Sequence, residues 1–386
     1  DYYHLGRRFP EGLWDSIVEN VHALEVETGR IFGSPENPLV VSVRSGSAVS
    51  MPGMMDTVLN MGVTDTTIDG VARMMHDDRP ALDAQRRLVQ GFASVVLGID
   101  RDRFETPLEE AKRDRGVRFD YELAPDDLRA LIGRFKQAIA EVTGKPLSED
   151  PWELLYQAVE AVFDSWNNPR AITYRDFEGI SHDLGTGCVI MAMVFGNLGP
   201  DSGTGVLFTR SPATGEKMLY GEFLANAQGE DVVAGVRTPS RISALRAEMP
   251  AIYEQIEATA RELEAHYREV QDIEFTVERG KLYILQTRTA KRTVPAAVRI
   301  AVDFVEEGVL TPHEAIGRIP AADIGQVLMP RFDADAMQEA LVSDRLLAEG
   351  EGRSPGAASG VVVMDPDRAV EMAATGQKVL LMRQET

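Results

Sequence analysis

The sequence predicts an α+β fold, and the main reason is the distribution of apolar residues along the chain. Residues 64–168 carry apolar side chains at helical spacing over most of their length. Strand-like apolar runs precede this block at residues 39–44 and follow it from Gly187 onward. A helical block between strand-rich stretches indicates a helical insertion in an α+β domain.

Composition limits the compartment and the partners. The chain has 386 residues, enough for two or three domains that each bury a core. Its 40 Lys and Arg against 61 Asp and Glu give a formal net charge of -21, which argues against broad contact with nucleic acid or an anionic membrane. Cys188 is the only cysteine, which excludes an intrachain disulfide and fits a reducing cytoplasm. No apolar run reaches transmembrane length. We therefore expect a cytoplasmic protein with no nucleic-acid or membrane partner.

The first elements are expected to be a helix, a strand and a loop of small residues. Apolar positions at helical spacing in residues 11–31 predict a helix that ends before Gly33, and Pro38 leads into a buried-type strand. Residues 45–56 follow, with the sequence Ser-Gly-Ser-Ala-Val-Ser-Met-Pro-Gly-Met-Met-Asp. Such a loop can expose successive backbone N–H groups to an anion, although it lacks the Gly-Lys-Ser/Thr ending of a P-loop. A plain connecting loop is the alternative.

The helical block has clear internal signals. One apolar stripe ends at Gly144, a typical C-terminal stop. Its members are Leu128, Leu131, Ile132, Phe135, Ile139 and Val142. Asp150 then supplies an N-cap, and Pro151 a first-turn proline, for a helix that runs to about Trp166. The Arg-rich residues 101–118 favour a solvated surface over a phosphate site.

The second half of the chain is predicted to begin with strands and continue with helices. Strands are expected at residues 188–195, 205–210 and 218–223, followed by a helix at about 244–269. A capping box from Thr311 to Glu314 starts a later helix. The strand, helix, strand order at residues 358–382 then indicates the opening of another domain.

Residues 272–288 are the most informative stretch and predict two strands around a turn at Gly280. Their alternation places three apolar residues on one face and three polar residues on the other: Ile273, Phe275 and Val277 against Asp272, Glu274 and Thr276. With a three-residue turn, Gln286 and Arg288 share the face of the two acids; with a two-residue turn they lie on the opposite face. Two carboxylates, an amide oxygen and a guanidinium on one face suit a Mg²⁺–polyphosphate complex. The alternative is an ordinary amphipathic hairpin with a solvated charged face.

Several long motifs occur in an order that is more specific than any one of them. They are residues 41–60, 165–170, 193–197, 202–206, 221–233 and 271–292, together with residues 354–360. The first six closely resemble the nucleotide-binding part of the pyruvate, phosphate dikinases, and the last resembles the entrance to that family's phosphohistidine domain.

The resemblance implies an ATP-grasp-like domain with a helical insertion, followed by a helical linker and the start of a swivelling phosphohistidine domain. Residues 1–63 would be the first subdomain, incomplete at its start, and residues 64–150 the insertion. Residues 151–291 would be the second subdomain, residues 292–350 the linker and residues 351–386 the truncated phosphohistidine domain. The start at Asp1 and the stop at Thr386 are expected to reflect a longer polypeptide.

The resemblance also implies a reaction with Mg²⁺ and ATP. ATP gives its two terminal phosphates to a histidine, phosphate removes one of them as pyrophosphate, and the phosphohistidine converts pyruvate to phosphoenolpyruvate. The chain's own phosphohistidine domain would be its partner, and a homodimer of the full-length protein is considered as well. The family's lysine in a Gly-Lys-Gly segment would precede Asp1, and its histidine would follow the strand at residues 378–382. His182 is interpreted as a turn histidine, so the fragment alone is expected not to complete the cycle.

Residue by residue, the resemblance implies these roles. Arg44 would contact the polyphosphate, and the loop at residues 45–56 would cover it. Ser45, Gly46, Gly53 and Asp56 would be the ATP-binding positions of this loop. Glu274 and Gln286 would hold Mg²⁺ with Asp272 close by, and Arg288 would stabilise charge on the transferring group. Arg44, Asp272, Glu274 and Arg288 form the catalytic set. Met193 and Val194 match a strand expected to border the adenine, with ordinary core residues as the alternative.

Two other functions remain open at this point. Related phosphotransferases, such as phosphoenolpyruvate synthase and rifampicin phosphotransferase, share the same two-domain engine with another acceptor, and a shortened family member would do so as well. A catalytically silent nucleotide-binding module is the third interpretation. The presence of Arg44, Asp272, Glu274, Gln286 and Arg288 argues against such loss of catalysis.

Overall fold

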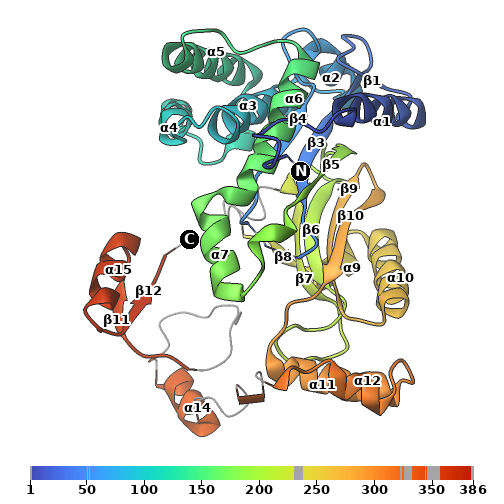
Figure 1. Cartoon of the computed structure of the whole chain (residues 1–386), viewed down its shortest axis with the longest axis vertical. Helices are drawn as coiled ribbons and strands as arrows, with labels where there is room; N and C mark the ends of the chain where they lie inside the picture. The colour runs from blue at the N-terminus through green and yellow to red at the C-terminus, as the bar shows by residue number, and fades with distance from the viewer. Residues whose placement is uncertain are drawn as a thin grey trace. The chain divides into compact units, whose positions relative to one another are not determined.

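The computed structural model describes residues 2–49, 51, 53–229, 238–321, 324–325, 333–343, 345 and 357–383. Helices and antiparallel sheets occur together in each of its two units, Asp1–Met193 and Val194–Thr386 (Figure 1). The predicted α+β class is therefore confirmed. Parts of several predicted segments lie outside the described residues. They are Ser50 and Pro52 of the loop, residues 230–233 of the motif that begins at Gly221, residues 322–323, 326–332, 344 and 346–350 of the linker, and residues 351–356 and 384–386 of the phosphohistidine segment. In the described part of the chain, no helix is both long and apolar enough to cross a membrane.

A small antiparallel sheet organises the first unit. Its central strand β3 (Val41–Gly46) pairs with β4 (Thr57–Met61) on one side and with β5 (Gly187–Ala192) on the other. The helix α6 (Pro151–Asp164) contacts all three strands. Further elements of this unit are α1 (Leu13–Thr28), β1 (Ile31–Phe32), β2 (Pro38–Leu39), α2 (Ile68–Met75), α3 (Asp78–Val95), α4 (Asp102–Arg115), α5 (Pro125–Thr143) and α7 (Pro169–Glu178), with the 3-10 turns η1 (Asp120–Glu122), η2 (Ser165–Asn167) and η3 (His182–Leu184).

The helices α3, α4 and α5 bury a core of their own. Within it, Phe104 and Phe135 meet edge to face with 5.2 Å between their ring centroids. The predicted stripe on α5 is buried at every position except Val142, which lies in the last turn and is 48% exposed. Both predicted helix boundaries are confirmed: Gly144 ends α5 with a φ of 74°, and the Asp150 carboxylate caps α6 by accepting from the Trp152 N–H at 2.9 Å.

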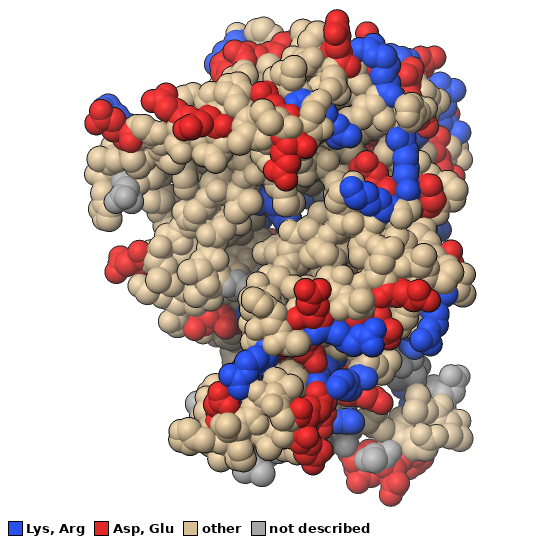
Figure 2. Space-filling view, turned by 90° about the vertical axis from the view of Figure 1, so that its right-hand side faces the viewer, with Lys and Arg blue, Asp and Glu red and all other residues tan. Residues whose placement is uncertain are grey.

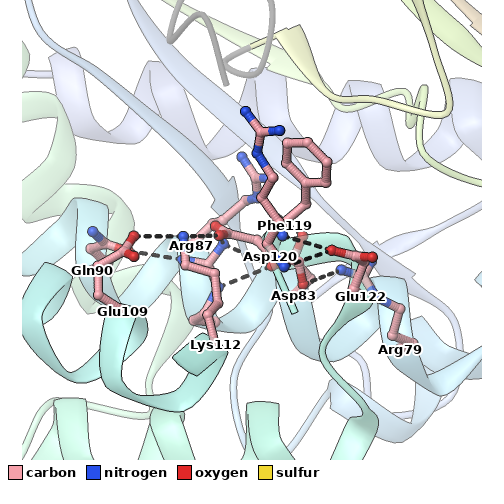
Figure 3. A network of polar contacts seen from close by, with 11 residues as sticks. Arg79, Asp83, Arg87, Gln90, Glu109, Lys112, Phe119, Asp120 and Glu122 are labelled. Atoms are coloured by element: carbon pink, nitrogen blue, oxygen red, sulfur yellow. Dashed lines mark hydrogen bonds and ion pairs between the residues drawn. The ribbon is translucent and has the colours of Figure 1, made fainter. Parts of the chain in front are cut away.

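A buried ionic network joins α3 to the chain that follows α4 (Figure 3). The Asp83 carboxylate is 2% exposed and accepts from Arg86 Nε and Nη2 at 3.0 and 2.8 Å and from Arg87 Nε at 3.1 Å. Asp120 extends the network, because its carboxylate lies 3.3 Å from Arg86 Nη2 and 3.2 Å from Lys112 Nζ. The polar side chains therefore form part of the interior of this unit.

The Arg-rich residues 101–118 are mostly surface, as predicted. Arg101 and Arg115 are exposed and form ion pairs with Glu105 and Asp127. Lys112 differs, since its side chain is only 11% exposed and belongs to the network of Figure 3. On the face of the molecule that Figure 2 shows, acidic and basic side chains are also interspersed.

The second unit is built on a five-stranded antiparallel sheet in the order β10-β9-β6-β7-β8. Its strands are β6 (Gly203–Phe208), β7 (Tyr220–Ala225), β8 (Ser240–Arg241), β9 (Gln271–Glu278) and β10 (Lys281–Thr289). Further elements are the turn η4 (Ile242–Ala244) and the helices α9 (Leu245–Glu248), α10 (Pro250–Tyr267), α11 (Val294–Glu306), α12 (Pro312–Gly317) and α14 (Ala334–Val342), then β11 (Val361–Val363), α15 (Pro366–Ala374) and β12 (Val379–Leu381). β11 and β12 pair in parallel, in line with the predicted strand, helix, strand order.

One face of the five-stranded sheet packs against α9 and α10. Ile273, Phe275 and Val277 of β9 are at most 1% exposed there and share a core with Ile252 and Ile256 of α10. The predicted apolar face of the hairpin is thereby confirmed. Its other face is left for the polar side chains.

Glycine in β6 makes room for the aromatic part of this core. A Cβ at Gly205 would lie 2.6 Å from Phe275 Cζ and 2.6 Å from the Glu222 carbonyl oxygen. We expect Gly205→Ala to lower the free energy of unfolding by about 1–3 kcal/mol, because the added methyl meets backbone as well as a packed ring. Urea unfolding of this chain measures the change. Gly133→Ala is the matched control, since Gly133 of α5 has nothing within 4 Å of its Cβ position, and a gain of about 1 kcal/mol is expected there. An unchanged free energy of unfolding for Gly205→Ala would show that the strands separate easily at this point.

The helices α11 and α12 are attached to the same unit. Phe304 and Ile300 of α11 share a core with Phe208 at the end of β6. Next to this core, Arg210 is fully buried and donates to Glu264 of α10 at 2.8 Å and to Glu307 at 2.8 Å. The start of the predicted linker is thus packed onto the sheet.

Candidate functional site

The hairpin of β9 and β10 turns over two residues, Arg279 and Gly280. Both have a positive φ, at 48° and 74°, as tight hairpin turns require. Lys281 pairs with Glu278, which leaves no third turn residue. Of the two turn lengths considered above, the two-residue turn is therefore the one that forms. By itself this turn would separate the polar residues of β10 from those of β9.

A β-bulge brings these residues back to one face. The register of the two strands shifts at Leu285, which is the extra residue of β10. Gln286 consequently lies opposite Glu274, and Arg288 opposite Asp272. Opposed residues of an antiparallel pair project from the same face. The four predicted side chains therefore share the polar face, although through a bulge and not through the turn.

Both carboxylates hold the Arg288 guanidinium. Arg288 Nε donates to Asp272 Oδ2 at 2.9 Å, and Nη2 donates to Glu274 Oε1 at 3.0 Å. All three side chains are about three quarters buried, with exposed fractions of 26%, 18% and 23% for Arg288, Asp272 and Glu274. Burial lowers the pKa of Arg288, but the two carboxylates raise it more, and the net shift is upward. The guanidinium is therefore charged and fixed in direction.

The sheet adds one acidic residue that the sequence analysis did not assign to the site. Val206 of β6 pairs with Glu274 on one side and with Glu222 of β7 on the other. Glu222 thus projects from the same face as the polar row. The signal that could have revealed it is weak, because β7 reads Tyr-Gly-Glu-Phe-Leu-Ala and Glu222 is its only charged residue. Among the residues that the structure describes, no three His, Cys, Asp or Glu side chains form a group that could hold a metal ion.

Arg44 lies in the middle of the first unit's sheet. It pairs with Thr57 of β4 and with Val189 of β5, and its side chain is half-buried. The strand continues beyond it through Ser45 and Gly46, which pair with β5. The predicted loop at residues 45–56 is therefore wrong at its start, because the β5 ladder holds its first two residues in the sheet. Gly53 lies within the loop and has a φ of 70°.

Asp56, the last residue of the loop, contacts the motif at residues 165–170. Asn168 Nδ2 donates to Asp56 Oδ2 at 2.7 Å, and Arg170 Nη2 donates to Asp56 Oδ1. Arg170 Nε also donates to the Met54 carbonyl oxygen at 3.2 Å. Two motifs that are far apart in sequence thus meet at one carboxylate.

Met193 and Val194 follow the end of β5. The Met193 N–H donates to the Val40 carbonyl oxygen at 2.8 Å, which extends the pairing beyond Ala192. Both side chains are half-buried. The predicted contact of Met193 and Val194 with the adenine stays a prediction.

His182 belongs to a structural network. Its Nδ1 lies 3.0 Å from Arg175 Nε, which can only donate, and its Nε2 lies 2.9 Å from Asp176 Oδ1. Trp166 Nε1 donates to the His182 carbonyl oxygen at 3.0 Å, and the fully buried Arg175 lies 4.1 Å from the centroid of that indole. These contacts fit the interpretation of His182 as a turn histidine.

Comparison of the sequence with known proteins places the chain in a family. The family model described as "Pyruvate phosphate dikinase, AMP/ATP-binding domain" matches residues 5–258 and 249–308. The chain belongs to the pyruvate phosphate dikinase family. Arg44 and the whole polar row of the hairpin lie within the matched residues.

Three curated relatives from the pyruvate phosphate dikinase family show how far the similarity extends. The pyruvate, phosphate dikinase of Rhizobium meliloti is 47% identical and that of Clostridium symbiosum 46% identical, each over 100% of this chain and 44% of the relative. The chloroplastic enzyme of Mesembryanthemum crystallinum is 45% identical over 100% of this chain and 40% of its own length. The chain thus spans less than half the length of these relatives.

Proposed function

We propose that this chain binds Mg²⁺ and ATP and passes the two terminal phosphates of ATP to a histidine on the phosphohistidine domain of the same polypeptide. With phosphate and pyruvate as further substrates, the whole enzyme would form AMP, pyrophosphate and phosphoenolpyruvate. The observation that carries the proposal is the row of Asp272, Glu274, Gln286 and Arg288 on one face of the hairpin. The match to an AMP/ATP-binding domain and the names of the relatives support it.

Phosphoryl transfer depends mainly on positioning and on stabilisation of charge. Arg288 supplies a guanidinium whose direction is set by two ion pairs at 2.9 and 3.0 Å. A guanidinium held in this way loses little side-chain entropy when it contacts phosphoryl oxygens. In this proposal Arg288 stabilises the charge of the transferring group, with Asp272 and Glu274 as its orienting partners.

The oxygen donors of the row fit Mg²⁺. Glu274 contributes a carboxylate and Gln286 an amide oxygen from directly opposed positions, and Asp272 adds a nearby second carboxylate. Mg²⁺ takes hard oxygen ligands, and one or two carboxylates together with substrate phosphates are its usual ligands in such enzymes. We propose Glu274 and Gln286 as its protein ligands. When bound, the ion would neutralise charge on the polyphosphate.

In the first unit, we propose that Arg44 contacts the polyphosphate and that the loop after Gly46 covers it, with backbone N–H groups supplied at Gly53 and Met55. Arg44 is suited to this role because pairing on both sides holds its strand in place. Gly53 has a φ of 70°, a conformation that exposes backbone without a Cβ in the way. Met193 and Val194 remain the proposed neighbours of the adenine.

The partners and the location also belong to the proposal. The histidine must visit more than one site, so part of the linker should swivel. Because α11 and α12 pack onto the sheet through Phe304 and Arg210, we place them with the nucleotide-binding part. We propose a cytoplasmic location from the single cysteine, although one of the relatives is chloroplastic by name.

The test uses the full-length protein with Mg²⁺ and ATP labelled on the β phosphate. We expect acid-labile label on histidine that moves to pyruvate when phosphate and pyruvate are added. Label that forms but never reaches pyruvate would indicate another acceptor. ATP binding without any labelled histidine would instead identify a catalytically silent nucleotide-binding module.

A further inference from the structure

The loop before β4 is fastened to the start of α7 by a set of contacts centred on Asp56. Asn168 and Arg170 each donate to one oxygen of the Asp56 carboxylate, and Arg170 also donates to the Met54 carbonyl oxygen. Ser165 Oγ lies 3.9 Å from Met55 Sδ. Both oxygens of Asp56 are therefore engaged, and its side chain is only 16% exposed.

The side chain of Asn168 is directed to this contact and not to its own helix. Asn168 is the N-cap residue of α7 and has the extended backbone of a cap, but its side chain makes no capping hydrogen bond. A capping Asn normally accepts from a backbone N–H of the first turn and stabilises a helix by about 1 kcal/mol. Here the amide Nδ2 donates to Asp56, and the side-chain oxygen caps no N–H of the helix. A local rule broken in this way is a typical mark of a functional constraint.

The geometry fixes the loop at both ends. At its start, Gly46 pairs with Gly187 in the β3–β5 ladder. At its end, Asp56 is held directly before Thr57, the first residue of β4. Gly53 lies between these points in a left-handed conformation, within a turn in which the Met54 N–H donates to the Met51 carbonyl oxygen at 3.1 Å.

We propose that Asp56, Asn168 and Arg170 form a clasp that positions the loop for the polyphosphate of ATP. This inference rests on the proposed function and changes the predicted role of Asp56 from nucleotide contact to positioning residue. A carboxylate close to a polyphosphate repels it. Pairing with Arg170 offsets that charge and holds the backbone at Gly53 and Met55 in place, so that their N–H groups can face the polyphosphate.

Two measurements on the full-length protein test the clasp with Asp56→Asn and Arg170→Gln. Hydrogen exchange of peptides that cover residues 53–60 reports the loop without any nucleotide. Equilibrium binding of Mg²⁺–ATP reports its consequence. We expect faster exchange in these peptides and affinity lower by about tenfold to a hundredfold, since small misplacements of binding groups have effects of this size.

Arg129→Gln is the matched control. Arg129 of α5 has the same exposed fraction as Arg170, 52%, and also pairs with an aspartate, Asp126. It should change neither exchange at residues 53–60 nor ATP affinity. Arg170→Lys keeps the charge but loses the forked donation to Asp56 and Met54, so it should recover only part of both properties.

The outcomes separate this inference from the proposed function. Unchanged exchange at residues 53–60 in Asp56→Asn and Arg170→Gln would overturn the clasp. Faster exchange with wild-type ATP affinity would also overturn its positioning role, while the proposed function would stand. Faster exchange together with weaker ATP binding supports the clasp. If the wild-type protein does not bind Mg²⁺–ATP, both the clasp and the proposed function are wrong.

Discussion

Glu274→Gln in the full-length protein is expected to reduce phosphorylation of the histidine by ATP about 10²-fold to 10³-fold. The substitution keeps the shape of the side chain and an oxygen that can accept from Arg288 at its present distance of 3.0 Å. It removes the negative charge that would bind Mg²⁺ and orient the guanidinium. Arg288→Ala should have an effect at least as large, because it removes the only group in the row that can neutralise the transferring phosphoryl charge. Labelled phosphohistidine formed in a single turnover is the measurement.

Lys281→Gln is the control for these two variants. Lys281 is an exposed cation at the tip of the same hairpin, where its ammonium lies 4.7 Å from the Tyr283 ring centroid. The Lys281→Gln protein should phosphorylate the histidine at the wild-type rate. Undiminished phosphorylation in Glu274→Gln or Arg288→Ala would reject the assigned roles. Circular dichroism should show that both variants keep the fold.

The hairpin shows how much of a strand's orientation can be predicted from the alternation of apolar and polar residues. The faces of β9 could be predicted because alternation is local and Ile273, Phe275 and Val277 must be buried together. The face of β10 could not, since it depends on the turn length and on the bulge at Leu285. The adjacent Ile284 and Leu285 are both apolar, so the sequence does not show which of them is the extra residue. Arg279 also adopts a positive φ that is uncommon for a residue with a side chain.

Contacts between distant segments were beyond the sequence analysis for a different reason. Asp56 and Asn168 are 112 residues apart, and the packing of α6 against β3 and β4 brings their surroundings together. The charges of α3 show the same limit. Asp83 and Arg86 lie three residues apart, a spacing that is usual on exposed helix faces, yet both are about 2% exposed. Burial here results from α2, α5 and β4, which all contact α3.

Asp83→Asn is expected to lower the free energy of unfolding of this chain by about 3 kcal/mol, because it removes the charge of the buried carboxylate nearest to Arg86 and leaves that buried guanidinium with the contact to Asp120 at 3.3 Å. Arg86 is 2% exposed and donates to Asp83 through Nε and Nη2. Urea unfolding at neutral pH measures the loss. Asp126→Asn is the control, since Asp126 is 89% exposed and pairs with the exposed Arg129, and such pairs contribute at most about 1 kcal/mol. Equal stability of the Asp83→Asn and wild-type proteins would show that the network of Figure 3 contributes nothing net.

The pH dependence of the same variant gives a second test with a defined sign. Burial raises the pKa of Asp83, but Arg87, Arg86 and Arg79 lower it more, and the net pKa lies far below the ordinary range. A carboxylate with a depressed pKa in the folded state contributes stability that is present above its unfolded pKa of about 4 and is lost as the pH falls toward the folded value. The difference in unfolding free energy between wild type and Asp83→Asn should therefore be constant from neutral pH down to about pH 5 and shrink below about pH 4. A difference that grows on acidification would mean that Asp83 is protonated in the folded protein, and the ionic account of this network would be wrong.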